Sequence, residues 1–292
     1  MPGAAEAIDR VREAGKRTVF VTNNASRSAR DFAAKLMKLR IPTEPSDVIT
    51  STHAVVSYLR EIGLARGSRV HVCGTDALAQ VLRSAGFATT KDTTNVEALV
   101  VAWNPSLQMD DLRRAADVAR AGVPFIGANR DATYPDEFGL LPGSGSILAA
   151  VETASGVAAT VVGKPQPELF RLALERGGAP RARTLFVGDR VDSDVVGARA
   201  AGLPVALVLS GVTTAEAAAA AQPRPEMIAD DLPSLLAGSS EAIVEVGTVE
   251  PVVVQDAVLS PSPTEGDDES QSGDEPADVS PERNAPVTLF DP

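Results

Sequence analysis

The sequence predicts an α/β protein in which helices cover mostly parallel sheets. Short apolar runs alternate with amphipathic helical patterns over most of the 292 residues, and this alternation is typical of parallel sheets packed between helices. Polar or acidic clusters follow several of the apolar runs directly, as they do where open α/β folds bind ligands. A final segment that is acidic and rich in Pro and Ser departs from the pattern.

Hydrophobic periodicity, together with Gly and Pro breaks, places the individual elements. We expect helices over 2–14, 28–39, 52–62, 77–84, 110–121, 146–153, 168–176 and 193–201. We expect strands over 17–22, 69–73, 98–103, 124–128, 161–164, 184–187 and 205–209, and a long polar loop over 129–145. Periodicity leaves open whether the middle of the chain is an inserted domain or a continuation of one sheet.

Composition indicates a cytoplasmic protein. Apolar residues make up 44% of the chain, which is ample for a core. No apolar run reaches membrane-spanning length, and no leader resembles a signal peptide. The single cysteine, Cys73, lies in an apolar strand pattern, so no disulfide framework exists and we interpret the thiol as a small buried hydrophobe.

The net charge of −12 resides in the last part of the chain. From Glu241 onward there are 13 acids and one Arg, so the first 240 residues are close to neutral. Neither a basic nucleic-acid footprint nor a cationic membrane face is visible, and we expect neither partner. The segment Ser239–Pro292 cannot bury enough apolar surface to offset its ordering entropy, so we expect disorder. A weak edge strand at 252–254 is the alternative to a wholly solvated tail.

Three loops with polar side chains follow predicted strands. They contain Thr22, Asn23 and Asn24 after the first strand, Lys164 beside Pro165, and Asp189, Asp192 and Asp194 after the run 184–187. Carboxylates this close repel one another unless a cation lies among them. Hydroxyl, backbone amides, lysine and carboxylates together suit a phosphate and Mg²⁺ site, with Asp189 and its neighbours on the metal.

Each residue also has a plainer interpretation. Lys164 alone is more typical of a surface lysine at a helix start. Thr22 and Asn24 could cap the following helix, and the acidic loop could do the same for its own helix. Asp192 is interpreted as a solvated loop acid and is left out of the metal site. His53 and His71 are interpreted as structural or exposed rather than catalytic.

Four motifs in order resemble the haloacid dehalogenase (HAD) superfamily, subfamily IIA. This subfamily contains nitrophenyl-phosphatase, phosphoglycolate, pyridoxal-phosphate and nucleotide-monophosphate phosphatases with a large α/β cap. Val-Thr-Asn-Asn (21–24) matches the second motif, Gly-Lys-Pro-Gln-Pro-Glu-Leu-Phe (163–170) the third, and Gly-Asp-Arg-Val-Asp-Ser-Asp (188–194) the fourth. The stretches 128–135 and 139–145 are similar to the cap signature, and the resemblance runs from residue 1 to about 238.

The resemblance implies a role for each loop. Thr22 would bind the transferred phosphoryl group, and Asn23 would contact phosphate or substrate beside Asn24. Lys164 would orient nucleophile and phosphate. Asp189 would ligate Mg²⁺, and Asp194 would act through water or by fixing Lys164. The cap loop 129–134 is the best candidate for substrate contacts.

The resemblance also implies a domain plan and a reaction. The first part of the Rossmann-like core would span 1–49, the cap 50–158, the second part of the core 159–238 and the tail 239–292. The cap would close over the substrate and form a homodimer. The reaction would be Mg²⁺-dependent hydrolysis of a small-metabolite phosphate monoester, such as glycerol phosphate or phosphoglycolate, through an aspartyl phosphate.

One motif of the family does not occur before Thr22. The family's first central strand ends in Asp-x-Asp-Gly, which supplies the nucleophile and the general acid. This chain begins at Met1-Pro-Gly-Ala, already on the next helix. Either the start site is placed too far downstream, or the strand is truly lost and the product is a catalytically dead phosphate-ligand-binding or interaction protein. In both cases we expect the printed chain to be inactive.

Overall fold

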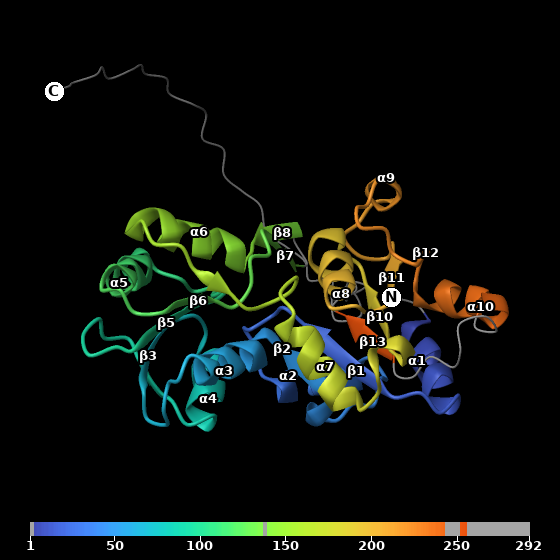
Figure 1. Ribbon diagram of the computed structural model, residues 1–292, viewed down its shortest axis with the longest axis horizontal. Coiled ribbons are helices and arrows are strands. Elements are labelled where there is room, and N and C mark those ends of the chain that lie inside the picture. Colours follow the sequence, from blue (N-terminus) through green and yellow to red (C-terminus); the bar gives the residue numbers. More distant parts are fainter. Residues whose placement is uncertain (1–2, 137–138, 243–251, 256–292) are drawn as a thin grey trace, which may run out of the picture. The chain divides into compact units, whose positions relative to one another are not determined.

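The computed structural model describes residues 3–136, 139–242 and 252–255, and it confirms the α/β class (Figure 1). The described residues form a six-stranded parallel sheet, a five-stranded parallel sheet and a two-stranded hairpin. The middle of the chain builds a sheet of its own and does not continue the first sheet.

The six-stranded sheet has the order β12-β11-β10-β13-β1-β2, and its neighbouring strands run parallel. Its strands are β1 (Thr18–Thr22), β2 (Val48–Thr50), β10 (Leu185–Gly188), β11 (Val205–Val208), β12 (Met227–Ala229) and β13 (Val252–Gln255). Strands β1 and β11 are buried along their whole length, as the apolar runs of strands covered on both faces predict.

Helices cover both faces of this sheet. They are α1 (Ala4–Glu13), α2 (Ala29–Lys38), α7 (Glu168–Gly177), α8 (Val196–Ala200), α9 (Ala215–Ala219) and α10 (Leu232–Ala242). Side chains of α1, α2 and α10 pack in one cluster that includes Phe20 and Val187. Side chains of α7 and α8 pack in another that includes Val19 and Phe186. Alternate residues of β1 thus feed two separate cores, as the period of a strand requires.

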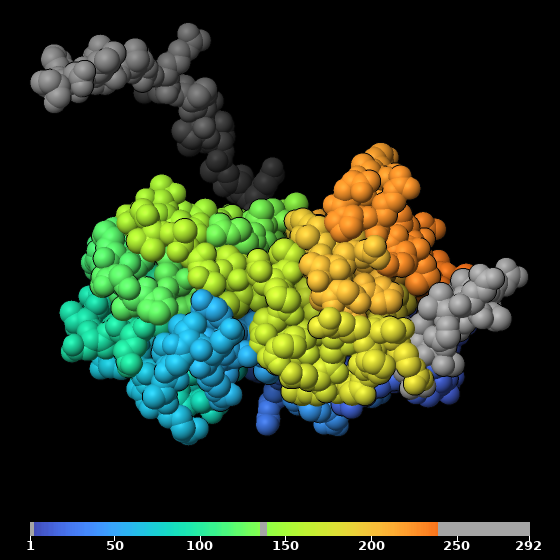
Figure 2. Space-filling model, viewed as in Figure 1, coloured from blue at the N-terminus to red at the C-terminus, as the bar shows by residue number. Residues whose placement is uncertain are grey.

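The five-stranded sheet has the order β4-β3-β5-β6-β9, again with parallel neighbours. Its strands are β3 (Arg69–Cys73), β4 (Ala88–Thr90), β5 (Ala98–Val101), β6 (Phe125–Gly127) and β9 (Thr160–Val161), and its helices are α3 (Ser51–Glu61), α4 (Asp76–Ser84), α5 (Met109–Arg120) and α6 (Ser144–Ser155). Helix α3 also lies beside α7, where Nη2 of Arg171 is 3.3 Å from the Ser57 hydroxyl (Figure 2).

The structure corrects two predicted elements and adds short ones that were not predicted. The polar loop 129–145 contains the hairpin of β7 (Thr133–Asp136) and β8 (Gly139–Pro142), and Tyr134 of β7 stacks on Trp103 with ring centroids 4.4 Å apart. The helix expected over 193–201 is a single π-type turn over Val191–Val195 followed by the short α8. Short elements were missed: β2, β4, β12, α9, α10 and the 3₁₀ turns Pro45–Asp47 and Arg181–Arg183.

The tail is the largest departure from prediction. Disorder was predicted from Ser239, but α10 extends to Ala242 and Val252–Gln255 forms a strand. That strand is central and not at an edge, because it pairs on both sides. The remaining tail residues, 243–251 and 256–292, lie outside the described residues. Within the described part of the chain, no helix combines the length and apolar character needed to cross a membrane.

Candidate active site

Thr22 and Asp189 lie at the same edge of the six-stranded sheet. Thr22 is the last residue of β1, and Asp189 directly follows β10. Because the strands are parallel, both residues stand at their carboxyl ends, where open α/β sheets bind ligands. Thr22 is fully buried, and its hydroxyl oxygen accepts a hydrogen bond from the Asn24 amide at 3.0 Å. Its hydroxyl proton remains available to donate.

Asn23 joins this edge to the loop that carries Lys164. Its side-chain Oδ1 accepts a hydrogen bond from the Lys164 amide at 2.8 Å, and its Nδ2 donates to the Lys164 carbonyl at 3.1 Å. The Asn23 carbonyl accepts from the Ser51 hydroxyl at 2.5 Å and from Nδ2 of Asn129 at 2.6 Å. The side-chain amide of Asn23 is therefore engaged within the protein, and the residue holds three loops together.

Lys164 and Asp194 form a buried ion pair. Nζ of Lys164 lies 3.1 Å from Oδ1 of Asp194, and both side chains are fully buried. Nζ also lies 5.8 Å from the centroid of the Phe186 ring. Apart from the ion pair, neither Nζ nor that Oδ1 has a hydrogen-bond partner among the described residues. A buried ammonium has three donors, so this pair has capacity for a further polar ligand.

Backbone amides hold both carboxyl groups, Asp189 from the loop after β11 and Asp194 from its own loop. Oδ2 of Asp189 accepts from the Val212 amide at 2.9 Å, and Oδ2 of Asp194 accepts from the Arg190 amide at 2.9 Å. Gly211 allows the close approach, because a Cβ there would collide with the Asp189 carboxyl group. Burial raises the pKa of Asp194; the charge of Lys164 opposes this and that of Asp189 adds to it.

The loop after β6 brings a further carboxyl group to the site. Asp131 accepts a hydrogen bond from Nδ2 of Asn23 at 3.1 Å. Burial raises the pKa of Asp131, and the nearby charges of Lys164 and Arg190 oppose the shift. The prediction named the loop 129–134 but no residue in it. The signal for Asp131 was its place just after the predicted strand 124–128, where the same sheet-edge argument applies.

The other residues singled out in the sequence make hydrogen bonds within the protein, are exposed to solvent, or are buried. Oδ1 of Asn24 accepts from the Ser26 amide and hydroxyl, both at 2.7 Å, and so fixes the turn. Asp192 is exposed, as expected for a loop acid. Nδ1 of His53 accepts from the Thr50 amide at the start of α3, and Nδ1 of His71 lies 2.8 Å from the Asp92 carbonyl. Cys73 is buried, which confirms the interpretation of its thiol.

The donor set suits Mg²⁺. Among the described residues, no group of three or more His, Cys, Asp or Glu side chains is placed to hold a metal. Mg²⁺ does not need such a cluster, because it is usually bound by one or two carboxylates, water and substrate phosphate oxygens. Asp189 and Asp194 offer the two carboxylates, and in the described part of the chain Oδ1 of Asp194 has only Lys164 as a partner.

The fold and the site define a class: α/β proteins with an inserted second sheet and an acid–lysine site at the carboxyl edge of parallel strands. The family profile described as Haloacid dehalogenase-like hydrolase matches residues 1–88, and a second profile of HAD-like hydrolases matches 161–235. An acid sugar phosphatase of Staphylococcus aureus is 32% identical over 214 residues, which cover 73% of this chain and 82% of the relative. The chain therefore belongs to the haloacid dehalogenase-like hydrolases, which confirms the resemblance predicted from its motifs.

Two further comparisons point to one relative. The D-glycerol 3-phosphate phosphatase of Mycobacterium tuberculosis is 43% identical over 236 residues, which cover 80% of this chain. This chain spans 65% of that relative's length. The crystal structure of glycerol phosphate phosphatase from M. tuberculosis in complex with magnesium superposes with a TM-score of 0.75 at 42% identity, over 80% of this chain and 70% of that one.

Proposed function

We propose that this protein is a cytoplasmic, Mg²⁺-dependent phosphatase of small phosphorylated metabolites, with glycerol phosphate or phosphoglycolate as the substrate class. The buried Lys164–Asp194 pair carries the proposal, because a cation and an acid with unused hydrogen-bonding capacity suit a phosphoryl group and a metal. The relatives support it: one is named a D-glycerol 3-phosphate phosphatase, another an acid sugar phosphatase, and a solved relative is in complex with magnesium.

Each polar group at the sheet edge has a task in this proposal. The Thr22 hydroxyl donates to a phosphoryl oxygen while its own oxygen is held by the Asn24 amide. Lys164 places a positive charge on the phosphoryl group. Asp189 would hold Mg²⁺, which when bound would supply Lewis-acid neutralisation of phosphate charge, and Asp194 fixes Lys164 through the ion pair. Asn23 keeps the Lys164 backbone in place through its two amide hydrogen bonds.

Asp131 suits the part of the substrate that does not react. A carboxylate repels phosphate but accepts hydrogen bonds from hydroxyl groups. It comes from the loop after β6 of the five-stranded sheet, whereas Thr22 and Asp189 come from strand ends of the six-stranded sheet. A small polyol phosphate would present its phosphate to Lys164 and its hydroxyls to Asp131. This arrangement favours glycerol phosphate over substrates without hydroxyls.

The alternative function is a phosphate-ligand-binding protein without turnover. Asp-x-Asp-Gly occurs nowhere in the 292 residues, so we expect the printed chain to bind phosphate but not to hydrolyse its esters. An in-frame Asp-x-Asp-Gly in the DNA upstream of Met1 would favour the enzyme and a misplaced start site. An in-frame stop codon there would favour the binding protein.

Calorimetric titration of the 292-residue chain with inorganic phosphate tests the proposal. We expect binding that requires Mg²⁺ and falls at least tenfold in Lys164→Met. An exposed lysine of α2 provides the control, Lys38→Met, which should bind as the wild type does. The absence of binding with and without Mg²⁺ would refute the proposed site. Turnover of p-nitrophenyl phosphate that disappears in Asp189→Asn would refute the expectation of an inactive chain.

A further inference from the structure

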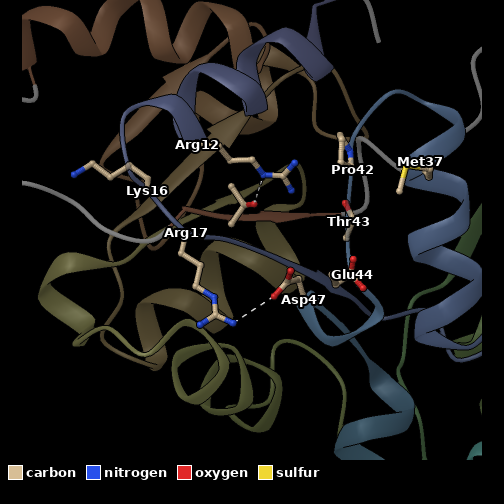
Figure 3. Close-up of a pocket in the computed structure, with 9 residues that line it drawn as sticks. Arg12, Lys16, Arg17, Met37, Pro42, Thr43, Glu44 and Asp47 are labelled. Atoms are coloured by element: carbon tan, nitrogen blue, oxygen red, sulfur yellow. Dashed lines mark hydrogen bonds and ion pairs between the residues drawn. The ribbon is translucent and has the colours of Figure 1, made fainter.

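A pocket of about 350 Å³ lies where β1 begins (Figure 3). Thr18, the first residue of β1, lines this pocket, whereas Thr22 at the other end of the same strand belongs to the candidate active site. At the usual rise of a strand the two residues are about 13 Å apart. The pocket is therefore separate from the phosphate site. Ligand pockets begin at about 300 Å³, so its volume suffices for a small metabolite.

One continuous part of the chain, residues 12–47, builds the walls of the pocket. Helix α1 contributes Arg12, helix α2 contributes Met37, and the loop after α2 contributes Thr43 and Glu44. Helix α1 packs against β1, and α2 packs against β2. The sheet and its covering helices therefore fix the shape of the pocket.

Arg12 places a positive charge in the pocket. Its Nε donates a hydrogen bond to the buried Thr18 hydroxyl at 3.0 Å, which holds the guanidinium group in place. The guanidinium is directed toward the wall that contains Pro42 and Thr43 (Figure 3). Among the described residues, no group accepts a hydrogen bond from its two Nη nitrogens. The N–H donors on these nitrogens form the planar fork that binds a carboxylate at two points.

The other basic side chains of the pocket are engaged elsewhere. Nη2 of Arg17 lies 3.3 Å from Oδ1 of Asp47, so these two charges neutralise each other. The side chain of Lys16 extends away from the rest of the pocket, and it has a partner of its own (Figure 3). Within the described part of the chain, this leaves Arg12 as the cation and Glu44 as the anion that line the pocket without an ion-pair partner.

Glu44 and Thr43 form an acceptor side opposite to this cation. Glu44 is exposed, and its side chain does not cap the 3₁₀ turn Pro45–Asp47 that follows it. The buried Thr43 hydroxyl donates to the Ile41 carbonyl at 3.0 Å. The oxygen of that hydroxyl therefore keeps its capacity to accept a hydrogen bond. A carboxylate and a hydroxyl oxygen on adjacent residues suit an ammonium group.

Met37 and Pro42 give the pocket an apolar part. Met37 is 53% exposed although its side chain is large and apolar. Methionine is flexible and polarisable, so it adapts to apolar groups of different shapes. The pocket thus combines a carboxylate-binding cation, an ammonium-binding anion and an apolar surface, which are the three features of a free amino acid with an apolar side chain.

We propose that this pocket is a binding site for a free α-amino acid with an apolar side chain. The ligand carboxylate accepts hydrogen bonds from the Nη nitrogens of Arg12. The ligand ammonium donates to the Glu44 carboxylate and the Thr43 hydroxyl oxygen, and the apolar side chain lies against Met37. A ligand with a single charge would leave either Arg12 or Glu44 unpaired, so the zwitterion is preferred. The proposal is independent of the phosphatase function, because the pocket shares no residue with the candidate active site.

Titration of the 292-residue chain with L-leucine, followed by NMR in buffer without phosphate and Mg²⁺, tests the proposal. We expect saturable binding of one leucine per chain. 4-Methylpentanoate lacks the ammonium group and 3-methylbutylamine lacks the carboxylate, so each should bind at least tenfold more weakly. The absence of saturable leucine binding would overturn the proposal. Binding of 4-methylpentanoate as tight as that of leucine would also overturn it, because the pocket would then recognise an anion alone.

Two variants with matched controls locate the binding. Glu44→Gln removes the anion from an exposed side chain, and Arg12→Lys keeps the charge but loses the planar fork. We expect each to weaken leucine binding at least tenfold. Glu13→Gln and Arg10→Lys alter exposed residues of α1 outside the pocket and should bind leucine within twofold of wild type. Unchanged binding in Glu44→Gln, or equal weakening in variants and controls, would overturn the proposal.

A variant of the candidate active site separates the two sites. Asp189→Asn should bind leucine as the wild type does, because Asp189 lies at the opposite edge of the sheet. Loss of leucine binding in Asp189→Asn would place the amino acid in the candidate active site and would overturn the separate pocket. Failure of the wild type to bind phosphate would refute the proposed function and leave the leucine result standing.

Discussion

The ammonium group of Lys164 and the carboxylate of Asp194 lie 3.1 Å apart with both side chains fully buried. Two buried charges lose their hydration, and their attraction alone seldom restores it. Oδ1 of Asp194 has no hydrogen-bond partner among the described residues besides this ion pair, so the pair is poorly compensated within the protein. A bound phosphoryl group and a cation would supply the missing hydrogen bonds and charge compensation. The pair is therefore better explained by ligand binding than by a contribution to stability.

Replacing one member of the pair should be more harmful than replacing both. Lys164→Met leaves Asp194 buried without its cation, and we expect unfolding free energy to fall by about 3–5 kcal/mol. In Lys164→Met/Asp194→Leu the loss should be smaller, because no charge remains buried. Urea denaturation of the three proteins measures this, with the exposed Lys38→Met within about 0.5 kcal/mol of wild type. A double variant less stable than Lys164→Met would contradict the argument.

Asn23 should matter for stability as well as for binding. Asn23→Ala leaves the Lys164 amide and carbonyl, both buried, without their partner. Each unsatisfied buried group costs about 1–3 kcal/mol. We therefore expect a loss of at least that size in denaturant unfolding, together with weaker phosphate binding. Asn104→Ala is the control, since that side chain makes a long 3.4 Å contact with the Gly74 carbonyl and a hydrogen bond within its own turn. Equal losses in both variants would argue against a special role for Asn23.

Gly163 should not tolerate a methyl group. A Cβ there would collide with the Ala128 carbonyl and come within 2.8 Å of Oδ1 of Asn23. Gly163→Ala must therefore push apart the loops that hold Lys164 and Asp131, and we expect destabilisation together with weaker phosphate binding. In α10, Gly238→Ala meets no atom within 4 Å and should be neutral or stabilising by about 1 kcal/mol. Thermal unfolding and phosphate titration of both variants check this contrast.

The sequence predicted the long elements and the loops of the site because those signals are local. The strand that ends at Thr22 and the run before Asp189 are apolar stretches followed at once by polar residues. The sheet rule that brings such ends together needs no knowledge of contacts. The same rule, applied to the strand 124–128, could have singled out Asp131 in the loop that follows.

What the sequence could not predict depends on distant partners. The segment Val252–Val254 is too short to be distinguished from a solvated stretch, and only its pairing with β1 and β10 makes it a central strand. Asn23 was expected to contact phosphate, but its amide group is engaged by the backbone of Lys164, far along the chain. The hairpin of β7 and β8 likewise depends on Trp103 in another loop.

The Cys73 thiol should be unreactive in the folded protein. Burial raises its pKa to about 11, so little thiolate is present at pH 8. We expect iodoacetamide to leave the native chain unmodified and to alkylate it fully in denaturant, as read by mass spectrometry. Because Cys73 is the only cysteine, each alkylated chain should carry one adduct. Modification of the native protein as fast as of the unfolded chain would show that the strand is open.

The two histidines should make the fold sensitive to mild acid. Burial lowers the pKa of both His53 and His71 below 6.5. As the pH falls below about 6.5, the unfolded chain binds protons on its histidines while the folded chain does not. The stability that the neutral histidines contribute is therefore full above pH 6.5, and it is lost as the pH falls through their pKa values in the folded protein. Each proton bound only by the unfolded state costs about 1.4 kcal/mol per pH unit.

Burial raises the pKa values of Asp131 and Asp194, which acts in the opposite direction but is common to wild type and variant. Urea unfolding between pH 7 and pH 5 should thus show a smaller loss in His53→Asn/His71→Asn than in wild type. An equal loss in both would show that the imidazoles are not protected from protons in the folded state.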